Sequence, residues 1–174
     1  MTDQASSTSG AAVAIRSFKR DDLPACRKLY KEGLLGGKLA ENDTGLDIDD
    51  IEQAYMSSPD DHFWIAETNG EVVGMIGVQH HEEGNGEIRR LRVAEAHRRK
   101  GIGSMLVEQA LKFCQQKGYL KITLDTFVER EAAIKLFEKF RFRHSRTKNV
   151  AGKEMMYFYL DLYTGEQAPA PKRA

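Results

Sequence analysis

The sequence has little of what stabilises secreted or membrane-spanning proteins. It contains only two cysteines in 174 residues, Cys26 and Cys114, and they lack the spacing of metal ligands. A chain of this length can bury a core without disulfides, so we expect two reduced thiols, no metal and a cytoplasmic protein. The longest apolar run, Val72 to Val78, is far too short to cross a bilayer, which argues against a membrane partner.

An excess of charge of one sign is also missing. The 26 basic and 26 acidic residues give a formal net charge of zero, so bulk charge does not support binding to nucleic acid. Residues 1–12 are rich in Ser, Thr and Ala and lack the basic start of a signal peptide, and residues 164–174 carry two prolines. We predict disordered tails at 1–12 and 164–174 and one domain over 13–163.

Hydrophobic periodicity and turn residues predict an α/β (α+β) domain. The predicted strands are 13–18, 62–68, 71–81, 86–94, 120–126, 142–146 and 155–162. The predicted helices are one from Asp21 to a stop at Gly36-Gly37, and three over 47–57, 102–117 and 131–140. Three hairpin-linked strands before a strand–helix–strand crossover indicate a mixed, mostly antiparallel sheet of six to seven strands flanked by about four helices.

The most informative segment joins the strand that ends in Leu91-Arg92-Val93 to the helix that begins near Ile102. The loop between them reads Arg98-Arg99-Lys100-Gly101-Ile102-Gly103-Ser104. The first N–H groups of a helix have no partner within it, and the helix dipole adds positive charge there. Glycines let the backbone approach a ligand closely, so the loop predicts an anion site suited to a pyrophosphate.

A Gly-x-Gly pair alone also fits a simple tight turn, and its flanks distinguish the two readings. Arg98-x-x-Gly101-x-Gly103, placed between a strand and an apolar helix, resembles the acetyl-CoA signature of the GNAT superfamily. Further resemblances at 63–74, 118–126 and 133–142 extend the match to about residues 13–162. The resemblance implies a sheet with a V-shaped splay after the strand 86–94.

That resemblance also implies a function: an N-acetyltransferase moves an acetyl group from acetyl-CoA to a primary amine by direct attack on the thioester. The acceptor is a small molecule or a lysine or N-terminal amine of a peptide. The alternative is a non-catalytic acyl-CoA-binding regulatory module of the same fold. The residues implied in coenzyme binding are Leu91, Arg92, Val93, Arg98, Arg99, Lys100, Gly101, Ile102, Gly103, Ser104, Arg130 and Phe137.

Proton handling is the less determined part of the chemistry. An alkyl ammonium has a pKa near about 10, so a base or a water chain must remove its proton. Glu87 lies where the family often keeps a catalytic Glu, although it also fits a surface charge. His80 and His81 end the previous strand, and alternation lets only one of them face the same cleft.

Two positions depart from the family pattern. Phe137 stands where many members have a Tyr that protonates the leaving thiolate, and Arg130 stands where an Asn is common. Phe137 has no proton to give and also fits a core aromatic. Water, or the hydroxyl of Tyr157 or Tyr159, would then protonate the leaving thiolate.

The charges are unevenly distributed along the chain. Six basic residues lie within 89–100, and a nucleic-acid patch is one interpretation of them. Half of them lie on the predicted phosphate loop, and alternation sends Arg89 and Arg90 to opposite faces, so coenzyme phosphates and a solvated face are the simpler explanation. The segment from Glu41 to Asp61 is acidic and predicts a rim that attracts a cationic amine such as a polyamine or lysine, or else a solvated helix. A subfamily resemblance, to enzymes that acetylate free amino acids and cysteine conjugates, points instead to acceptors with a carboxylate. The aromatic strand 155–162 either pairs across a homodimer or lies in the core.

Overall fold

The computed structural model describes residues 11–35 and 43–163, so the tail predictions for 1–10 and 164–174 fall outside the described residues. The strands are β1 (Ala14–Ser17), β2 (His62–Thr68), β3 (Glu71–His81), β4 (Asn85–Val93), β5 (Lys121–Phe127), β6 (Arg143–Val150) and β7 (Lys153–Asp161). The helices are α1 (Leu23–Glu32), α2 (Leu46–Asp49), α3 (Ile51–Tyr55), α4 (Ile102–Gln116) and α5 (Glu131–Lys139). Short 3₁₀ helices are η1 (Arg20–Asp22), η3 (Glu82–Gly84) and η4 (Glu95–His97).

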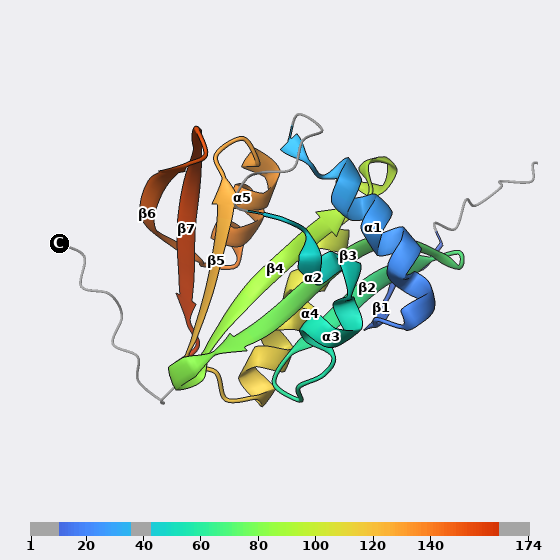
Figure 1. Ribbon diagram of the computed structural model, residues 1–174, viewed down its shortest axis with the longest axis horizontal. Coiled ribbons are helices and arrows are strands. Elements are labelled where there is room, and N and C mark those ends of the chain that lie inside the picture. The colour runs from blue at the N-terminus through green and yellow to red at the C-terminus, as the bar shows by residue number, and fades with distance from the viewer. Residues whose placement is uncertain (1–10, 36–42, 164–174) are drawn as a thin grey trace, which may run out of the picture.

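The described strands form one seven-stranded sheet in the order β1-β2-β3-β4-β5-β7-β6 (Figure 1). Every pair is antiparallel except β4 and β5, which confirms the mixed, mostly antiparallel sheet. Pairing between β4 and β5 is limited to the stretch from Asn85 to Glu87, beside Lys121 to Thr123. Beyond Glu87 the two strands diverge, as the predicted splay requires (Figure 1).

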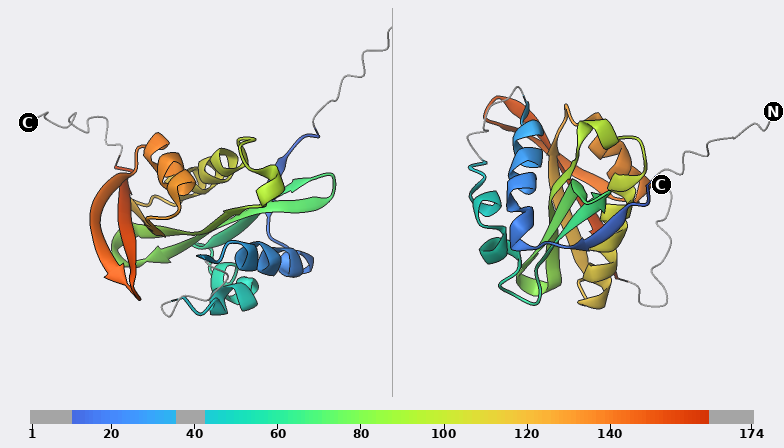
Figure 2. Two further views of the ribbon diagram at one scale, coloured as in Figure 1. Left: turned by 90° about the horizontal axis from the view of Figure 1, so that it is seen from above. Right: turned by 90° about the vertical axis from the view of Figure 1, so that its right-hand side faces the viewer.

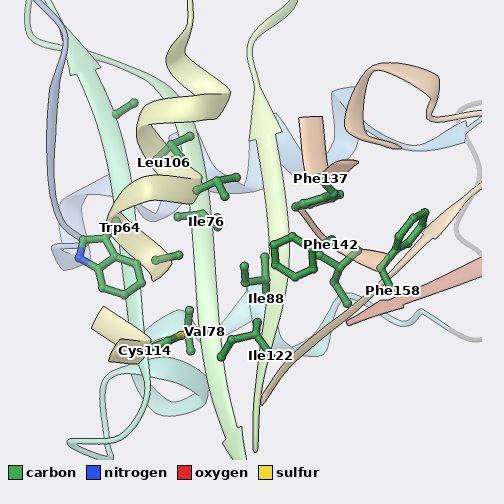
Figure 3. Packing of buried hydrophobic residues seen from close by; sticks show 14 of the residues in the cluster. Trp64, Ile76, Val78, Ile88, Leu106, Cys114, Ile122, Phe137, Phe142 and Phe158 are labelled. Atoms are coloured by element: carbon green, nitrogen blue, oxygen red, sulfur yellow. The ribbon is translucent and has the colours of Figure 1, made fainter. Parts of the chain in front are cut away.

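Helices cover both faces of the sheet, with α4 and α5 on one side and α1, α2 and α3 on the other (Figure 2). Side chains of β3 alternate between two apolar clusters. Ile76 lies beside Leu106 of α4 and Val78 lies near Cys114 of the same helix, as Figure 3 shows, whereas Met75 packs with residues of α1, α2 and α3. The sheet therefore separates an α4 face from an α1 face, and the site lies where the sheet opens between them.

Two helix predictions were wrong in their bounds. Helix α1 ends at Glu32 rather than at Gly36, because the Gly33 N–H bonds to the carbonyls of Leu29 and Tyr30 and ends the ladder there. The single helix predicted over 47–57 is two short helices. Asp50 breaks it with φ −141° and ψ 74°, and its side chain accepts the Gln53 N–H as the N-cap of α3.

The last strand does not lie at an edge. Strand β7 pairs with β5 on one side and β6 on the other, so both of its edges are occupied within this chain, and Met155 and Phe158 lie in the core. Strand β6 runs to Val150, beyond the predicted end at Arg146. Its side chains are almost all exposed, and Ala151 and Gly152, both with positive φ, turn the chain into β7.

Arg90 joins the α1 face to the sheet at an irregularity in β4. Its φ is 61°, and the β3–β4 register shifts beside it, between Met75 and Gly77. The guanidinium is 6% exposed and donates four hydrogen bonds to Asp43 and Asp47, at 2.5–2.8 Å. The Tyr55 hydroxyl donates a further bond to Asp47. This Arg90 cluster fixes the start of α2 against β4.

The same irregularity corrects the prediction that Arg89 and Arg90 face opposite sides. Arg89 donates to the Gln79 side chain, which itself donates to the Ala54 carbonyl of α3. Arg90 reaches Asp47 of α2. Both arginines therefore lie on the α1 face, because an extra residue in a strand shifts the alternation.

Truncation of Leu106 tests the packing of α4 on the sheet. Leu106 is fully buried, so we expect Leu106→Ala to lower the free energy of unfolding by about 2–5 kcal/mol. Leu46→Ala removes the same atoms from a side chain that is 70% exposed, and we expect a change within about 0.5 kcal/mol. Urea unfolding measures both, and equal losses would contradict the assignment of the core.

Removal of Arg90 tests its cluster. We expect Arg90→Met to cost about 3–5 kcal/mol in urea unfolding at pH 7, because it leaves buried carboxylates unpaired. Arg20→Met is the control: it breaks a solvent-exposed pair with Glu52, and because such pairs contribute little to stability, we expect a much smaller loss than in Arg90→Met.

The free energy of unfolding should change with pH in opposite directions in the wild-type protein and in Arg90→Met. Burial raises the pKa of Asp43 and Asp47, but the hydrogen bonds from Arg90 outweigh it and hold both pKa values below their ordinary range. The wild-type protein keeps this stability above a pH of about 4 and loses it as pH falls through the lowered pKa values. In Arg90→Met, burial without a partner raises both pKa values, so acidification from pH 7 to pH 5 should increase its stability.

Candidate active site

A cavity of about 960 Å³ occupies the opening between β4 and β5. It extends from the N-terminus of α4 to the C-terminus of α1, and the start of α5 forms a further wall. All the residues of β4 from Glu87 to Val93 line it, as do those of β5 from Leu124 to Phe127. The cavity therefore connects the two faces of the sheet through the splay.

The predicted phosphate loop lies at the α4 end of this cavity. Gly101 is the N-cap of α4 in the left-handed conformation, with φ 79°, and a Cβ there would meet nothing within 4 Å. No side chain caps the helix, so the amides of its first turn are open to a ligand. Gly101, Ile102, Gly103 and Ser104 all line the cavity.

The basic residues of the loop do not contribute equally. Arg98 and Arg99 line the cavity, and Arg98 donates from Nε to the Val93 carbonyl at 3.2 Å. Lys100 is exposed and is not among the residues that line the cavity. The structure thus brings two of the three predicted cations to the site.

The end of β4 presents its side chains to both faces. Leu91 and Val93 pack against the apolar cluster of α4, and Arg92 extends to the α1 face, where it contacts Gly33. Because no β5 residue pairs with this part of β4, its backbone faces the cavity. The carbonyls of Leu91 and Val93 at this edge accept hydrogen bonds from the Arg92 and Arg98 side chains.

Two carboxylates lie on the α1 side of the opening. Glu87 is paired in register with Thr123, so Asp125, two residues farther on, lies on the same face of the sheet. Both line the cavity. The Asp125 side chain has access to water in the cavity, but the surrounding protein removes part of its hydration. This partial burial, and then the negative charge of Glu87, raise the pKa of its carboxyl group.

The sequence reading missed Asp125 as a site residue. Its signal was an acidic residue between Leu124 and Thr126, which are both buried, in a strand expected to run parallel to the one that carries Glu87. That Glu87 and Asp125 lie close together can be predicted only when the register between the two strands is known.

The two histidines at the end of β3 have separate partners. His81 Nε2 lies 2.6 Å from Glu87 Oε2, so His81 is the one beside the site. His80 Nδ1 lies 2.7 Å from Asp61, and this hydrogen bond raises the pKa of His80. Glu87 is therefore connected to solvent through the half-exposed ring of His81.

The start of α5 supplies the last wall. Phe137 is buried, lines the cavity and packs edge-on against Phe142, with ring centroids 5.5 Å apart. Arg130 donates from Nη2 to the Gly33 carbonyl at 2.5 Å, so it bridges α5 and α1. Burial, and then Arg98, lower the pKa of Arg130.

The tyrosines suggested as acids lie on β7. The Arg146 guanidinium stacks on the Tyr157 ring at 4.7 Å, and the Lys121 ammonium lies over the Tyr159 ring at 5.4 Å. Neither tyrosine is among the residues that line the cavity.

The acidic segment is largely occupied by partners within the chain. Asp43 and Asp47 bind Arg90, Glu52 binds Arg20, and Asp61 accepts from His80; Glu41 lies outside the described residues. Asp43 is the one carboxylate of this segment that lines the cavity. Across the described residues, the pairing of these carboxylates favours a solvated acidic surface over a rim that attracts a cationic amine.

The described residues contain neither a candidate membrane span nor a candidate metal site. No helix there is both long and apolar enough to cross a membrane. No group of three or more His, Cys, Asp or Glu side chains in the same part of the chain could hold a metal ion.

Proteins of similar sequence are N-acetyltransferases by name. The chain is 40% identical over 99 residues to N-acetylaspartate synthetase of Xenopus tropicalis, covering 56% of this chain and 36% of that protein. It is 36% identical over 104 residues to the probable N-acetyltransferase camello of the same species, covering 59% and 48%. The matches thus span about a third to a half of the length of these relatives.

Solved structures share the fold. A GNAT-family acetyltransferase from Staphylococcus aureus Mu50 superposes with a TM-score of 0.76 at 19% identity, covering 87% of this chain and 99% of that one. A putative acetyltransferase from Salmonella typhimurium, solved with its cofactor acetyl-CoA, has a TM-score of 0.74 at 20% identity, covering 91% and 99%. The model of the acetyltransferase (GNAT) family matches residues 23–142, well over half of the chain, and the protein therefore belongs to this family.

Proposed function

We propose that the protein is an N-acetyltransferase that moves an acetyl group from acetyl-CoA to the primary amine of a small molecule. The observation that carries this proposal is the cavity itself. It joins an anion-binding helix terminus on the α4 face to a carboxylate pair on the α1 face through the opening between β4 and β5. Such a passage lets two substrates approach one point from opposite sides of the sheet.

The α4 end fits the coenzyme. The open amides after Gly101, with Arg98 and Arg99 beside them, suit a pyrophosphate. The edge of β4 near Leu91, which no residue of β5 pairs with, suits the amides of the pantetheine arm once the Arg92 and Arg98 side chains release the Leu91 and Val93 carbonyls. Phe137 offers an apolar wall without a hydroxyl. Acetyl-CoA supplies the activated acetyl group, and the chain positions it.

The carboxylate pair fits removal of the proton from the amine. The nitrogen of the neutral amine forms a bond to the acetyl carbon as the carbon–sulfur bond breaks, and one proton must leave the nitrogen. A carboxyl group with a raised pKa, such as that of Asp125, accepts this proton more readily than an ordinary carboxylate. Glu87 and His81 extend the path to solvent. The departing thiolate takes its proton from water.

The names of the relatives support a small-molecule acceptor. One is an N-acetylaspartate synthetase, a name that specifies an acetylated amino acid as product. The alternative, an acyl-CoA-binding module without turnover, rests on the missing hydroxyl at Phe137. Release of CoA thiol from acetyl-CoA, measured against a panel of amino acids, polyamines and lysine peptides, distinguishes them: tight coenzyme binding without turnover would contradict the enzyme.

Neutralising the carboxylates should slow the reaction. We expect Asp125→Asn and Glu87→Gln each to lower kcat/KM for the amine by about 10²-fold or more at pH 7, as loss of a general base does. The rate should partly recover at higher pH, where more amine is neutral. Glu108→Gln, on the exposed side of α4, is the control and should keep the wild-type rate. Unchanged rates in both site variants would exclude these groups as the base.

Two glycines with the same backbone conformation test the coenzyme loop. Gly101 (φ 79°) and Gly152 (φ 80°) both lack a neighbour that a Cβ would meet, so Gly101→Val and Gly152→Val carry similar backbone strain. We expect only Gly101→Val to weaken CoA binding, by about 10-fold or more, because its side chain covers the open amides. Titration calorimetry with CoA measures both, and equal affinities would place the coenzyme elsewhere.

A further inference from the structure

Two arginines meet over Gly33 at the α1 end of the cavity. The Arg92 side chain extends from β4 and packs directly on Gly33. A Cβ atom added to Gly33 would lie only 2.4 Å from Arg92 Nε. Arg130 extends from the start of α5 and donates to the Gly33 carbonyl. Both line the cavity. Three elements that are far apart in the sequence thus bring two cations to one point.

Neither arginine is neutralised by a described residue. The Arg92 guanidinium donates from Nη1 to the Leu91 carbonyl at 2.8 Å, and its Nε is buried without a hydrogen-bond partner among the described residues. Burial, and then the neighbouring Arg130 and Arg90, lower the pKa of Arg92 to about 9, which leaves it charged at neutral pH. A buried cation without a carboxylate is costly to the fold.

The carboxylates around this pair are engaged or exposed. Glu129, which precedes Arg130 and lines the cavity, is exposed, and its charge only partly offsets the lowering of the Arg130 pKa. Asp43 and Asp47 accept four hydrogen bonds from Arg90. Glu32, on the cavity rim, is exposed and lies 3.9 Å from Lys28. An anion from outside the described chain would therefore satisfy the Arg92 and Arg130 pair better than any group now beside it.

We propose that Arg92, with Arg130, binds a carboxylate of the acceptor, so that the substrate is an amine of the amino-acid class. This rests on the proposed function. A guanidinium pairs with a carboxylate through two parallel hydrogen bonds, and the guanidinium groups of Arg92 and Arg130 belong to two residues that both line the cavity. A phosphate accepts hydrogen bonds from a guanidinium in the same way. However, Arg92 lies on the α1 face of the sheet, whereas the predicted phosphate loop precedes α4 on the opposite face, so a coenzyme phosphate is the less suitable ligand.

Gly33 is the positioning residue of this carboxylate site. Its φ of −82° is accessible to any residue, so glycine is not required there by the backbone. What glycine provides is the space that the Arg92 side chain occupies. Gly33→Ala therefore displaces the guanidinium without removing its charge.

The test compares each L-amino acid with its α-carboxamide as acceptor. For the wild-type enzyme we expect kcat/KM to favour the carboxylate by about 10- to 100-fold, the effect of one charged hydrogen-bonded contact. Arg92→Gln should abolish this preference by raising the KM of the acid form, and Gly33→Ala should weaken it. A comparison of kcat/KM for L-aspartate and L-asparagine shows whether Arg92 binds a side-chain carboxylate instead of the α-carboxylate.

The KM for acetyl-CoA distinguishes the two anions. It should stay unchanged in Arg92→Gln and in the exposed control Arg20→Gln. If Arg92→Gln raises the KM for acetyl-CoA and leaves the acid-to-amide preference intact, Arg92 binds a coenzyme phosphate and the proposal is wrong. A wild-type enzyme that acetylates acids and amides equally, or prefers polyamines, also overturns it.

Two further measurements do not depend on turnover. Arg92→Gln should raise the Tm of the protein without ligands, because it removes a buried charge that its neighbours repel; an arginine with a purely structural role would lower the Tm. Calorimetry on CoA-saturated protein should show binding of the carboxylates and not of the carboxamides. If no amine is acetylated, the proposed function fails, and this binding difference still decides the carboxylate site.

Discussion

The arrangement of the site depends on the conformation of one residue, Arg90. A strand that alternated regularly from Ile88, which packs on the α4 side, would direct residues 90 and 92 to that side as well. The extra residue at Arg90, with its positive φ, shifts the alternation, so that Leu91 and Val93 pack toward α4 and Arg92 reaches the α1 face. The hydrogen bonds to Asp43 and Asp47 hold Arg90 in this conformation. The end of β4 is thereby divided into an apolar side for α4 and a cationic side for the acceptor.

The same ion cluster resolves a conflict in the charge pattern of the sequence. The acidic segment suggested a cationic acceptor, whereas the subfamily resemblance suggested one with a carboxylate. Asp43 and Asp47 are bound to Arg90, and the other paired carboxylates of the segment lie outside the cavity. Arg92 and Arg130 are left as the uncompensated charges at the α1 end, among the described residues. A run of like charge in a sequence therefore says little about a site until its partners are known.

Local signals in the sequence were sufficient for much of the fold. The bounds of β2 and β3 match their prediction to the residue, because Asn69-Gly70 fixes the turn between two strongly apolar strands. The start of α4 was also predictable, since a strand, a glycine-containing turn and an amphipathic helix follow one another directly in the sequence. The break at Asp50 was not, because the side chain of an aspartate in a helical pattern caps or continues the helix according to its surroundings.

The parts of the site that escaped prediction all depend on contacts between distant segments. Asp125 joins Glu87 only through the parallel register of β4 and β5. Gly33 read as an ordinary helical residue, whereas it ends α1 and accommodates Arg92, which is 59 positions farther along the chain. The bulge at Arg90 has no glycine to mark it, and its strain is compensated by partners more than forty residues away. Binary pattern and propensity carry no information on such pairings.

The distribution of charge along the cavity fits the charges of a free amino acid. Such an acceptor arrives as a zwitterion, with a carboxylate that needs a cation and an ammonium that must lose a proton before it can attack. In the proposed site, Arg92 and Arg130 at the α1 end would bind the carboxylate of the acceptor. Glu87 and Asp125 would take the proton from its ammonium group. Because protonation of the thiolate can be left to water at a thiol pKa of about 8.5, the absence of a hydroxyl at Phe137 is compatible with turnover. The demanding steps are then to bind a charged acceptor and to deprotonate it, and these are the steps for which the described residues provide groups.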